Sequence, residues 1–377
     1  MTHSICSTYS SPSVSIIQQD SPINQLPDDV FIDISKYLNV KDILSCRSTC
    51  KRLYTVLQGN MIWKDRFSSD FPGINKKFND YLSAYKLLYS NLTQGVYASF
   101  DLQGHKSRIC AFAVLGNTLF SGSEDRMIKV WDLSSKECIA TLRGHKDEVR
   151  SLAVLGNTLF SGSDDRTIKV WDLSSKKCIA ILQGHKRGVH ALAILGSTLV
   201  SGSYDRTIKV WDLNSKECIA TLQGHEDGIR SLAVSDSTLF SGSWDSTIKV
   251  WNLSSEKCIA TLQGHKDAVI SLAVLGKTLL SGSYDKTIKV WDLNSKECVA
   301  TLRGHKDIVV SLAPLGNTLF SSSADMTIKV WDLNSNKCIA SLQKGEDASL
   351  VILDGKLISE SHCMIKVRDF TAFDQEE

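Results

Sequence analysis

The sequence lacks the long hydrophobic runs and the excess of charge that would direct a protein to a membrane or to nucleic acid. No apolar stretch approaches the roughly 20 residues that a membrane-spanning helix needs. The formal net charge of the 377-residue chain is only +2, so we expect no nucleic-acid partner and no membrane partner. The Ser-rich N-terminus has neither a basic start nor an apolar block, and we expect no secretory signal there.

Common signatures of catalytic and metal sites are also missing. The chain contains no Gly-rich phosphate loop, no paired-Cys zinc spacing and no His-Glu-x-x-His motif. We therefore expect no catalytic residues, no metal and no cofactor, and we predict that the protein is not an enzyme.

A repeat of 40 residues dominates the rest of the sequence. Gly-His pairs recur from Gly104 onward, and a Trp follows each of these His residues by 26 positions. The unit that runs from Gly144 to Leu182 contains the segments VRSLAVL, TLFSGS, TIKVWDL and CIAIL, which have the alternation or the β-branched and aromatic content of strands. Turn residues such as Gly156-Asn157 separate them. Each unit is therefore predicted to be a four-stranded sheet that must stack on its neighbours.

The Gly-His and Trp-Asp pairs at this period resemble the WD-repeat family, and the resemblance implies a β-propeller. A damaged unit follows Cys338: Gly345-Glu346 replaces Gly-His, the turn Asp is missing near His362, and Arg368 stands where Trp belongs. Residues 96–102 match the last strand of a unit without its earlier strands. We predict a mainly β fold, a seven-bladed propeller over 96–370 with a degenerate last blade closed by strand 96–102, and then a tail over 371–377.

A His, a Ser, an Asp and a Trp recur together in six units and could be mistaken for a catalytic set. Because an enzyme rarely carries six equal active sites, we interpret them as structural. In the WD-repeat family the corresponding residues form a hydrogen-bond network from the Asp turn through His and Ser to the Trp indole N–H. The sequence does not settle which Ser of Ser-Gly-Ser takes part, and the resemblance favours the first. It implies a network of His105, Ser121, Asp125, Trp131, His145, Ser161, Asp165, Trp171, His185, Ser201, Asp205, Trp211, His225, Ser241, Asp245, Trp251, His265, Ser281, Asp285, Trp291, His305, Ser321, Asp325 and Trp331.

Six of the eleven cysteines recur at one place in the repeat: Cys138, Cys178, Cys218, Cys258, Cys298 and Cys338. Equivalent positions in successive repeats should lie farther apart than the roughly 7 Å between Cα atoms that a disulfide allows. We expect buried or half-buried thiols in a reducing compartment, which predicts a cytoplasmic or nuclear location.

A second pattern occupies residues 23–68, where helical spacing of apolar residues follows Leu26-Pro27. The segment resembles an F-box, with Leu-Pro at its start, Tyr-Leu before Asp-Ile-Leu, then Cys-Lys-Arg-Leu and Ile-Trp-Lys. The F-box family binds the Skp adaptor of cullin-based ubiquitin ligases. The alternative is a helical cap on the propeller. The resemblance implies adaptor contacts through Leu26, Pro27, Ile34, Leu38, Leu44 and Leu53.

The segment over 69–95 has apolar and aromatic residues at helical spacing and ends at Gly95. We predict a stiff helical linker docked on the propeller; an aromatic stripe that binds peptides is the alternative. Residues 1–22 are predicted to be disordered.

Positions that differ between the otherwise similar repeats point to a binding face. One such place holds Cys110, Arg150, His190, Arg230, Ile270 and Val310; the place before the turn Asp holds Glu124, Asp164, Tyr204, Trp244, Tyr284 and Ala324. In propeller geometry both face the same entrance of the central channel. Arg and aromatic residues often carry binding energy, and Arg suits phosphate or carboxylate. We predict substrate binding by Arg150, Arg187, His190, Tyr204, Arg230, Trp244, Ile270 and Tyr284.

Some F-box propellers that read phosphorylated segments use Arg at these places, which strengthens the prediction. Glu124, Glu148 and Asp164 weaken it because they could neutralise the arginines, and a solvated rim with incidental charges is the alternative. The combined pattern predicts the substrate-recognition subunit of a Skp–cullin–F-box ubiquitin ligase, whose propeller binds an acidic or phosphorylated segment of a target protein. The alternatives are a WD-repeat scaffold without a role in ubiquitin transfer and a pathogen effector that acts in the host cytosol.

Overall fold

The computed structural model describes residues 97–343, 349–353, 355–361 and 363–370. The predicted disordered start, F-box, helical linker and tail lie outside these residues. Within the described ranges no helix is long and apolar enough to cross a membrane.

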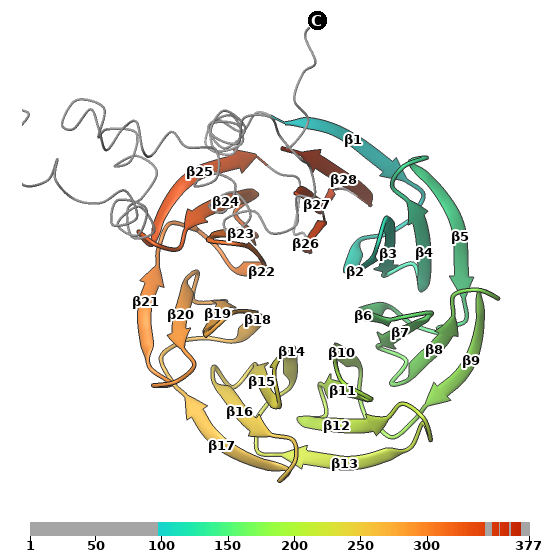
Figure 1. Cartoon of the computed structure of the whole chain (residues 1–377), viewed down its shortest axis with the longest axis horizontal. Helices are drawn as coiled ribbons and strands as arrows, with labels where there is room; N and C mark the ends of the chain where they lie inside the picture. The colour runs from blue at the N-terminus through green and yellow to red at the C-terminus, as the bar shows by residue number, and fades with distance from the viewer. Residues whose placement is uncertain (1–96, 344–348, 354, 362, 371–377) are drawn as a thin grey trace, which may run out of the picture. The chain divides into compact units, whose positions relative to one another are not determined.

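The described chain folds into seven four-stranded antiparallel sheets arranged in a ring (Figure 1), which confirms the predicted seven-bladed propeller. In the first six blades the strands follow the chain from the innermost to the outermost position. Blade 1 contains β2 (Ile109–Leu115), β3 (Thr118–Ser123), β4 (Met127–Asp132) and β5 (Glu137–Arg143). Blade 2 contains β6 (Val149–Leu155), β7 (Thr158–Ser163), β8 (Ile168–Asp172) and β9 (Lys177–Leu182).

The next blades repeat this arrangement. Blade 3 contains β10 (Val189–Leu195), β11 (Thr198–Ser203), β12 (Thr207–Asp212) and β13 (Cys218–Gln223). Blade 4 contains β14 (Ile229–Ser235), β15 (Thr238–Ser243), β16 (Ile248–Asn252) and β17 (Lys257–Leu262). Blade 5 contains β18 (Val269–Leu275), β19 (Thr278–Ser283), β20 (Ile288–Asp292) and β21 (Cys298–Leu302). Blade 6 contains β22 (Val309–Leu315), β23 (Thr318–Ser323), β24 (Thr327–Asp332) and β25 (Lys337–Gln343).

The hydrophobic core is divided among the interfaces between neighbouring blades. Trp251 of blade 4 is buried against Val200, Ile208 and Leu222 of blade 3, and each pair of blades from 1 to 6 is packed in this way. Burial of a large apolar side chain contributes about 1.5–3 kcal/mol, so the stacking of blades supplies the stability that one sheet lacks.

The glycine of Ser-Gly-Ser is required by this stacking. A Cβ atom added to Gly122 would lie 2.6 Å from Cγ1 of Val149 in the next blade. Blade 6 has Ser322 at this position and blade 7 has Glu360, and both side chains are buried. These two interfaces therefore accommodate a side chain that the others exclude.

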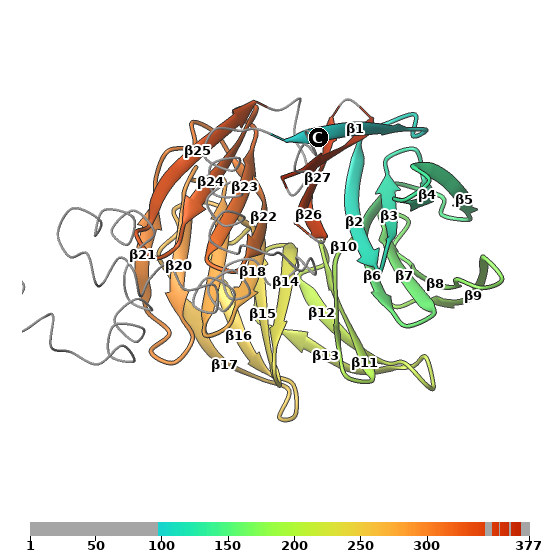
Figure 2. The ribbon, with the colours of Figure 1, turned by 45° about the horizontal axis from the view of Figure 1, so that its top comes forward.

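Blade 7 closes the ring with strands from both ends of the described chain. Its order is β26 (Leu350–Leu353), β27 (Lys356–Ser361), β28 (Met364–Asp369) and, outermost, β1 (Ala98–Gln103), as Figure 2 shows from a second direction. Arg368 takes the place of the repeated Trp: it is 2% exposed and donates from Nη1 to Ser359 Oγ at 2.6 Å. A guanidinium thus replaces the indole as the donor to this serine.

The recurrent cysteines contradict the expectation that they are buried or half-buried. All six are exposed free thiols, and Cys178, for example, donates from Sγ to the backbone oxygen of Ala180 at 3.3 Å. They lie at the beginning of the outermost strands, which have a neighbouring strand on one side only. A residue there has no further strand to cover it, whatever its hydrophobicity.

Candidate functional site

The recurrent His, Ser, Asp and Trp side chains form one hydrogen-bond chain in each of the first six blades. The His Nδ1–Asp Oδ2 distances are 2.6–3.0 Å, and the His Nε2–Ser Oγ distances are 2.7–2.8 Å. Each Trp donates from Nε1 to the same Ser Oγ at 2.8 Å. The first Ser of each Ser-Gly-Ser is the member of this chain. The third has another role: Ser163 Oγ donates to the backbone oxygen of Asp147 at 3.1 Å.

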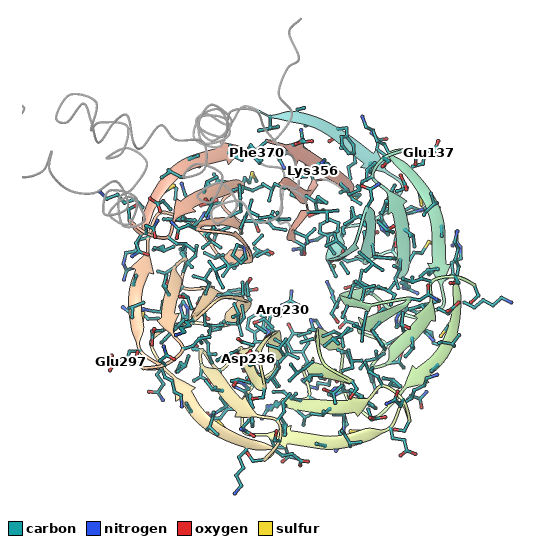
Figure 3. The ribbon with its side chains drawn as sticks, in the orientation of Figure 1. Glu137, Arg230, Asp236, Glu297, Lys356 and Phe370 are labelled. Atoms are coloured by element: carbon teal, nitrogen blue, oxygen red, sulfur yellow. The ribbon has the colours of Figure 1, made fainter. Side chains whose placement is uncertain are left out.

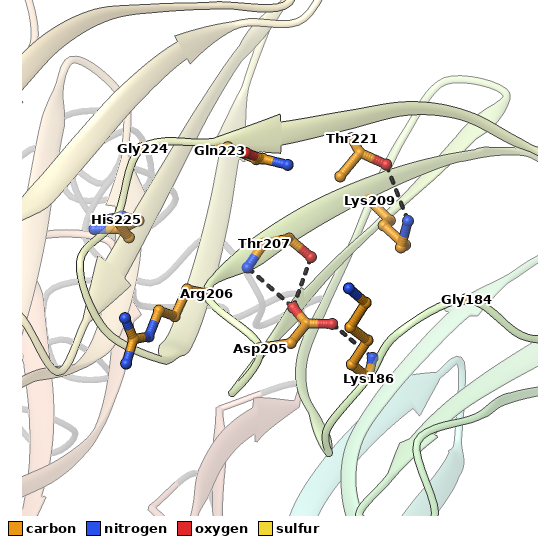
Figure 4. A pocket seen from close by; sticks show the side chains of 10 residues that line it. All are labelled: Gly184, Lys186, Asp205, Arg206, Thr207, Lys209, Thr221, Gln223, Gly224 and His225. Atoms are coloured by element: carbon orange, nitrogen blue, oxygen red, sulfur yellow. Dashed lines mark hydrogen bonds between the residues drawn. The ribbon is translucent and has the colours of Figure 1, made fainter.

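Burial closes this network to a substrate: the first Ser of each set is 0% exposed, and the His side chains are 0–1% exposed. Because the indole N–H can only donate, Ser Oγ accepts from Trp and donates to His Nε2, while His Nδ1–H donates to Asp. Figure 4 shows the Asp end of the network in blade 3, where Asp205 also accepts from Thr207 and from the backbone N–H of Lys186. Burial raises the pKa of Asp125, but hydrogen bonds from His105 and backbone amides outweigh it and hold the pKa at about 2. These buried groups hold turns together.

In each of the first six blades a backbone hydrogen bond joins the residue before the turn Asp to the residue two positions before the other variable place, so that both places lie at the same end of the ring. The amide of Tyr204 donates to the oxygen of Gly188 at 3.1 Å, and the amide of Trp244 donates to the oxygen of Gly228 at 3.0 Å. The innermost strands surround a cavity of about 280 Å³ at the centre of the ring, and four predicted substrate-binding residues line it: Arg150, His190, Arg230 and Ile270. Figure 3 shows Arg230 at the inner edge of the ring. We call the end of this central cavity that bears the variable turns the channel mouth.

Carboxylates of two blades surround the guanidinium of Arg150. Its Nε donates to Asp164 Oδ2 at 2.8 Å, its Nη1 lies 3.3 Å from Glu124 Oε1, and its Nη2 contacts Glu148 Oε2. Nη1 also lies 3.2 Å from the Sγ atom of Cys110. Every nitrogen of this guanidinium therefore has a protein partner, and Arg150 is not available as a free anchor for phosphate.

Arg230 has a different environment, because its partner is a neutral imidazole. Its Nη1 donates to His190 Nδ1 at 2.8 Å, and His190 Nε2 lies 2.7 Å from Asp164 Oδ1. Since a guanidinium only donates, His190 Nδ1 is the acceptor and Nε2 carries the proton toward Asp164. Burial lowers the pKa of His190 and outweighs its hydrogen bond with Asp164. Among the described residues no carboxylate forms an ion pair with Arg230.

Three aromatic residues from successive blades continue from His190 around the channel mouth. The ring centroids lie 4.2 Å apart for His190 and Tyr204, 6.3 Å for Tyr204 and Trp244, and 4.9 Å for Trp244 and Tyr284. The buried indole nitrogen of Trp244 has no hydrogen-bond partner within the described part of the chain. We call Tyr204, Trp244 and Tyr284 the aromatic arc; it offers a ligand a stacking surface.

The predicted site residues are therefore not all brought together. Arg187 is exposed on the loop before β10 and does not line the central cavity, and the predicted adaptor-binding residues lie outside the described ranges. The role of Asp164 as the shared partner of Arg150 and His190 was missed. The available signal was an acidic residue before the turn Asp of one repeat together with basic residues at the other variable place of the same repeat and of the next.

A second cavity, of about 530 Å³, lies beside β12 and β13 and is lined in part by Lys186, Lys209 and Thr221 (Figure 4). Lys209 Nζ donates to Thr221 Oγ1 at 3.0 Å, and blades 1, 4 and 5 have the same Lys–Thr pair. This lining follows the repeat, whereas the channel mouth differs from blade to blade. No group of His, Cys, Asp and Glu residues in the described ranges could hold a metal ion.

Comparison with known proteins agrees with this architecture. The family model described as WD domain, G-beta repeat, matches residues 97–132, 136–172, 176–212, 216–252, 256–292 and 296–332, together more than half of the chain. The protein is therefore a WD-repeat propeller. The family model described as F-box-like matches residues 23–69. The chain belongs to the F-box/WD-repeat family, as the sequence motifs predicted.

Curated relatives match shorter parts of the chain. F-box/WD repeat-containing protein 7 of Drosophila melanogaster is 34% identical over 140 residues, which cover 32% of this chain and 11% of the relative. Zinc finger CCCH domain-containing protein 62 of Arabidopsis thaliana is 50% identical over 42 residues, or 11% of this chain and 10% of the relative. CCR4-associated factor 4 homolog of Candida glabrata is 44% identical over 45 residues, or 12% and 7%. The chain thus spans about a tenth of the length of these relatives.

Proposed function

We propose that the protein is the substrate-recognition subunit of a Skp–cullin–F-box ubiquitin ligase. The F-box would bind the Skp-type adaptor and, through it, the cullin, while the channel mouth would bind an acidic or phosphorylated segment of a target protein. The observation that carries the proposal is the combination of an F-box-like segment with a complete WD propeller in one chain. The relative from Drosophila melanogaster combines the same two modules in its name.

In this role the protein positions the target, and its partners catalyse the transfer of ubiquitin. The repeated network of the first six blades is buried, and its side chains hold turns together. A receptor that holds a target lysine close to a ubiquitin-charged enzyme converts an encounter between two molecules into a reaction within one assembly. The proposed location is the cytoplasm or the nucleus, or the host cytosol if the protein is a pathogen effector.

Arg230 and the aromatic arc support the channel mouth as the target site. Arg230 donates one hydrogen bond, to the imidazole of His190, and its guanidinium has further N–H donors for a ligand. Hydrogen bonds from Arg to carboxylate or phosphate are stronger than those between neutral groups. Tyr204, Trp244 and Tyr284 lie beside it, and aromatic side chains are frequent anchors of interfaces.

The test of the ligase role is co-purification of the full-length protein with a Skp-type adaptor. We expect Leu26→Ala/Pro27→Ala to lose the adaptor, and Arg230→Ala, a matched control in the propeller, to retain it. Ubiquitin transfer to a captured target in the reconstituted ligase then separates a receptor from a passive scaffold. If the wild-type protein does not bind the adaptor, the proposal is wrong and a WD-repeat scaffold remains.

A further inference from the structure

We propose that the channel mouth accepts one anionic side chain and places a basic side chain of the same ligand against an acidic wall. The ligand is thus a peptide segment with a single phosphate or carboxylate, a Lys or Arg on one side of it and an apolar residue on the other. This inference rests on the proposed function of the channel mouth as a target site and specifies the chemistry of the target segment.

The anionic group belongs at Arg230. A guanidinium has five N–H donors, and within the described part of the chain the hydrogen bond of Arg230 uses one of them, toward a neutral imidazole. The same contact fixes the side chain in position, because His190 is held in turn by Asp164 at 2.7 Å. A half-buried cation with a neutral partner gains more from an incoming anion than a cation that is already paired, because its charge is not yet compensated.

The acidic wall consists of Glu124, Glu148 and Asp164 around Arg150. One guanidinium against three carboxylates leaves a formal charge of −2; Arg108, which also lines the cavity and has interactions of its own, reduces it to −1. The three carboxylate side chains are 26–30% exposed, although the Oε2 atom of Glu148 is itself buried, so a ligand can reach part of this wall. A second phosphate placed here would meet like charge, whereas a Lys or Arg would meet its opposite.

The apolar residue belongs on the aromatic arc. The arc begins at Tyr204, whose ring packs against His190, the partner of Arg230, and it extends to blade 5 through Trp244 and Tyr284. The acidic wall lies on blades 1 and 2. Arg230 comes from blade 4, but its Nη1 reaches back to His190 of blade 3, so its guanidinium lies between the acidic wall and the Trp244–Tyr284 part of the arc. This arrangement predicts the order basic, anionic, apolar along the ligand.

The experiment uses the full-length protein, immobilised directly so that peptide binding is measured without the adaptor. The probes are two libraries of short peptides, one with a fixed central phosphoserine and one with a fixed central Glu, with all other positions randomised. We expect the retained peptides to be enriched in Lys or Arg on one side and in aromatic or aliphatic residues on the other. The randomised positions also include phosphoserine at low frequency. Asp, Glu and this second phosphoserine should be depleted among the retained peptides.

Two variants test which residues of the channel mouth cause the enrichment of particular peptides. Arg230→Ala should weaken the binding of a retained peptide about ten- to a hundredfold, as the loss of hydrogen bonds to a charged group implies. The nearly isosteric Glu124→Gln/Glu148→Gln should remove the preference for Lys or Arg and leave the requirement for the anion intact. Thermal melting of each variant establishes that the propeller is folded.

The outcomes separate this inference from the proposed function. Enrichment of a second acidic residue or phosphoserine, with binding still dependent on Arg230, overturns the inference and leaves the target site standing. Retention that does not change with Arg230→Ala, or retention of neither library, overturns both the target site and the inference, while the adaptor experiment tests the F-box independently.

Discussion

Replacement of Ser241 by alanine tests whether the repeated network stabilises the propeller. Ser241 is fully buried in blade 4, where its Oγ atom accepts from Trp251 Nε1 at 2.8 Å and contacts His225 Nε2 at 2.7 Å. The change leaves two buried polar atoms without a partner, and each such atom costs about 1–3 kcal/mol. We therefore expect Ser241→Ala to lower the free energy of unfolding by about 2–6 kcal/mol.

The measurement is the midpoint of thermal unfolding. For a domain of this size a loss of 1 kcal/mol lowers Tm by about 2–4 °C, so the expected loss is at least several degrees. Ser255→Ala is the matched control, because Ser255 is exposed in the same blade. Equal melting temperatures for Ser241→Ala and Ser255→Ala would refute the assignment of stability to the network.

A double-mutant cycle sharpens the result. Trp251→Phe removes the indole donor and leaves Ser241 with the imidazole as its remaining partner in the network. If the two side chains stabilise the blade through their mutual hydrogen bond, the free energy of unfolding should fall less in the double variant than the sum of its decreases in the two single variants. Strict additivity would mean that each residue acts through packing alone.

Further outcomes follow from other parts of the structure. Asp125 in the turn and Asp164, which bridges Arg150 and His190, have pKa values lowered to about 2. The stability that they contribute should be complete above the unfolded pKa of about 3.9 and be lost as the pH falls through about 2. Melting curves at decreasing pH check this. A thiol reagent applied to the folded protein should label the six recurrent cysteines, which are exposed, before Cys110, because burial raises the pKa of the Cys110 thiol; mass spectrometry of the labelled peptides checks the order. Replacement of buried Arg368 by Trp should raise Tm, because replacing a buried charge by an apolar side chain is often stabilising by about 1–4 kcal/mol; an unchanged or lower Tm would show that the contact of Arg368 with Ser359 already suits blade 7.

The sequence alone predicted the ring, because the 40-residue period carries both the strand pattern and the stacking requirement. It named Glu124, Glu148 and Asp164 as residues that could neutralise the arginines, but it could not predict that all three would contact Arg150. That residue and Asp164 belong to one blade, but Glu124 belongs to another, and their contacts depend on how adjacent blades are rotated relative to each other. The variable columns of the repeat located the channel mouth, whereas the division of its charge between Arg150 and Arg230 required the geometry.

Burial of the cysteines was a wrong expectation for a related reason. The segment CIAIL has the composition of an interior strand, and composition does not reveal which strand of a sheet is outermost. In the structure Ile179 of this segment is 51% exposed. Position in the ring, set by the order of strands, outweighed the hydrophobicity of the residues.

The closure of blade 7 has a consequence for the synthesis of the protein. β1 pairs with β28 from Ala98↔Asp369 to Gln103↔Met364, so the first strand of the ring finds its partner only after nearly the whole chain has been made. At about 5–20 residues per second, translation of the intervening chain takes roughly 10–50 s. During that time β1 is a strand without a sheet, and the ring cannot close. A premature stop before β28 would therefore leave six intact repeats in a molecule whose two ends have nothing to join them.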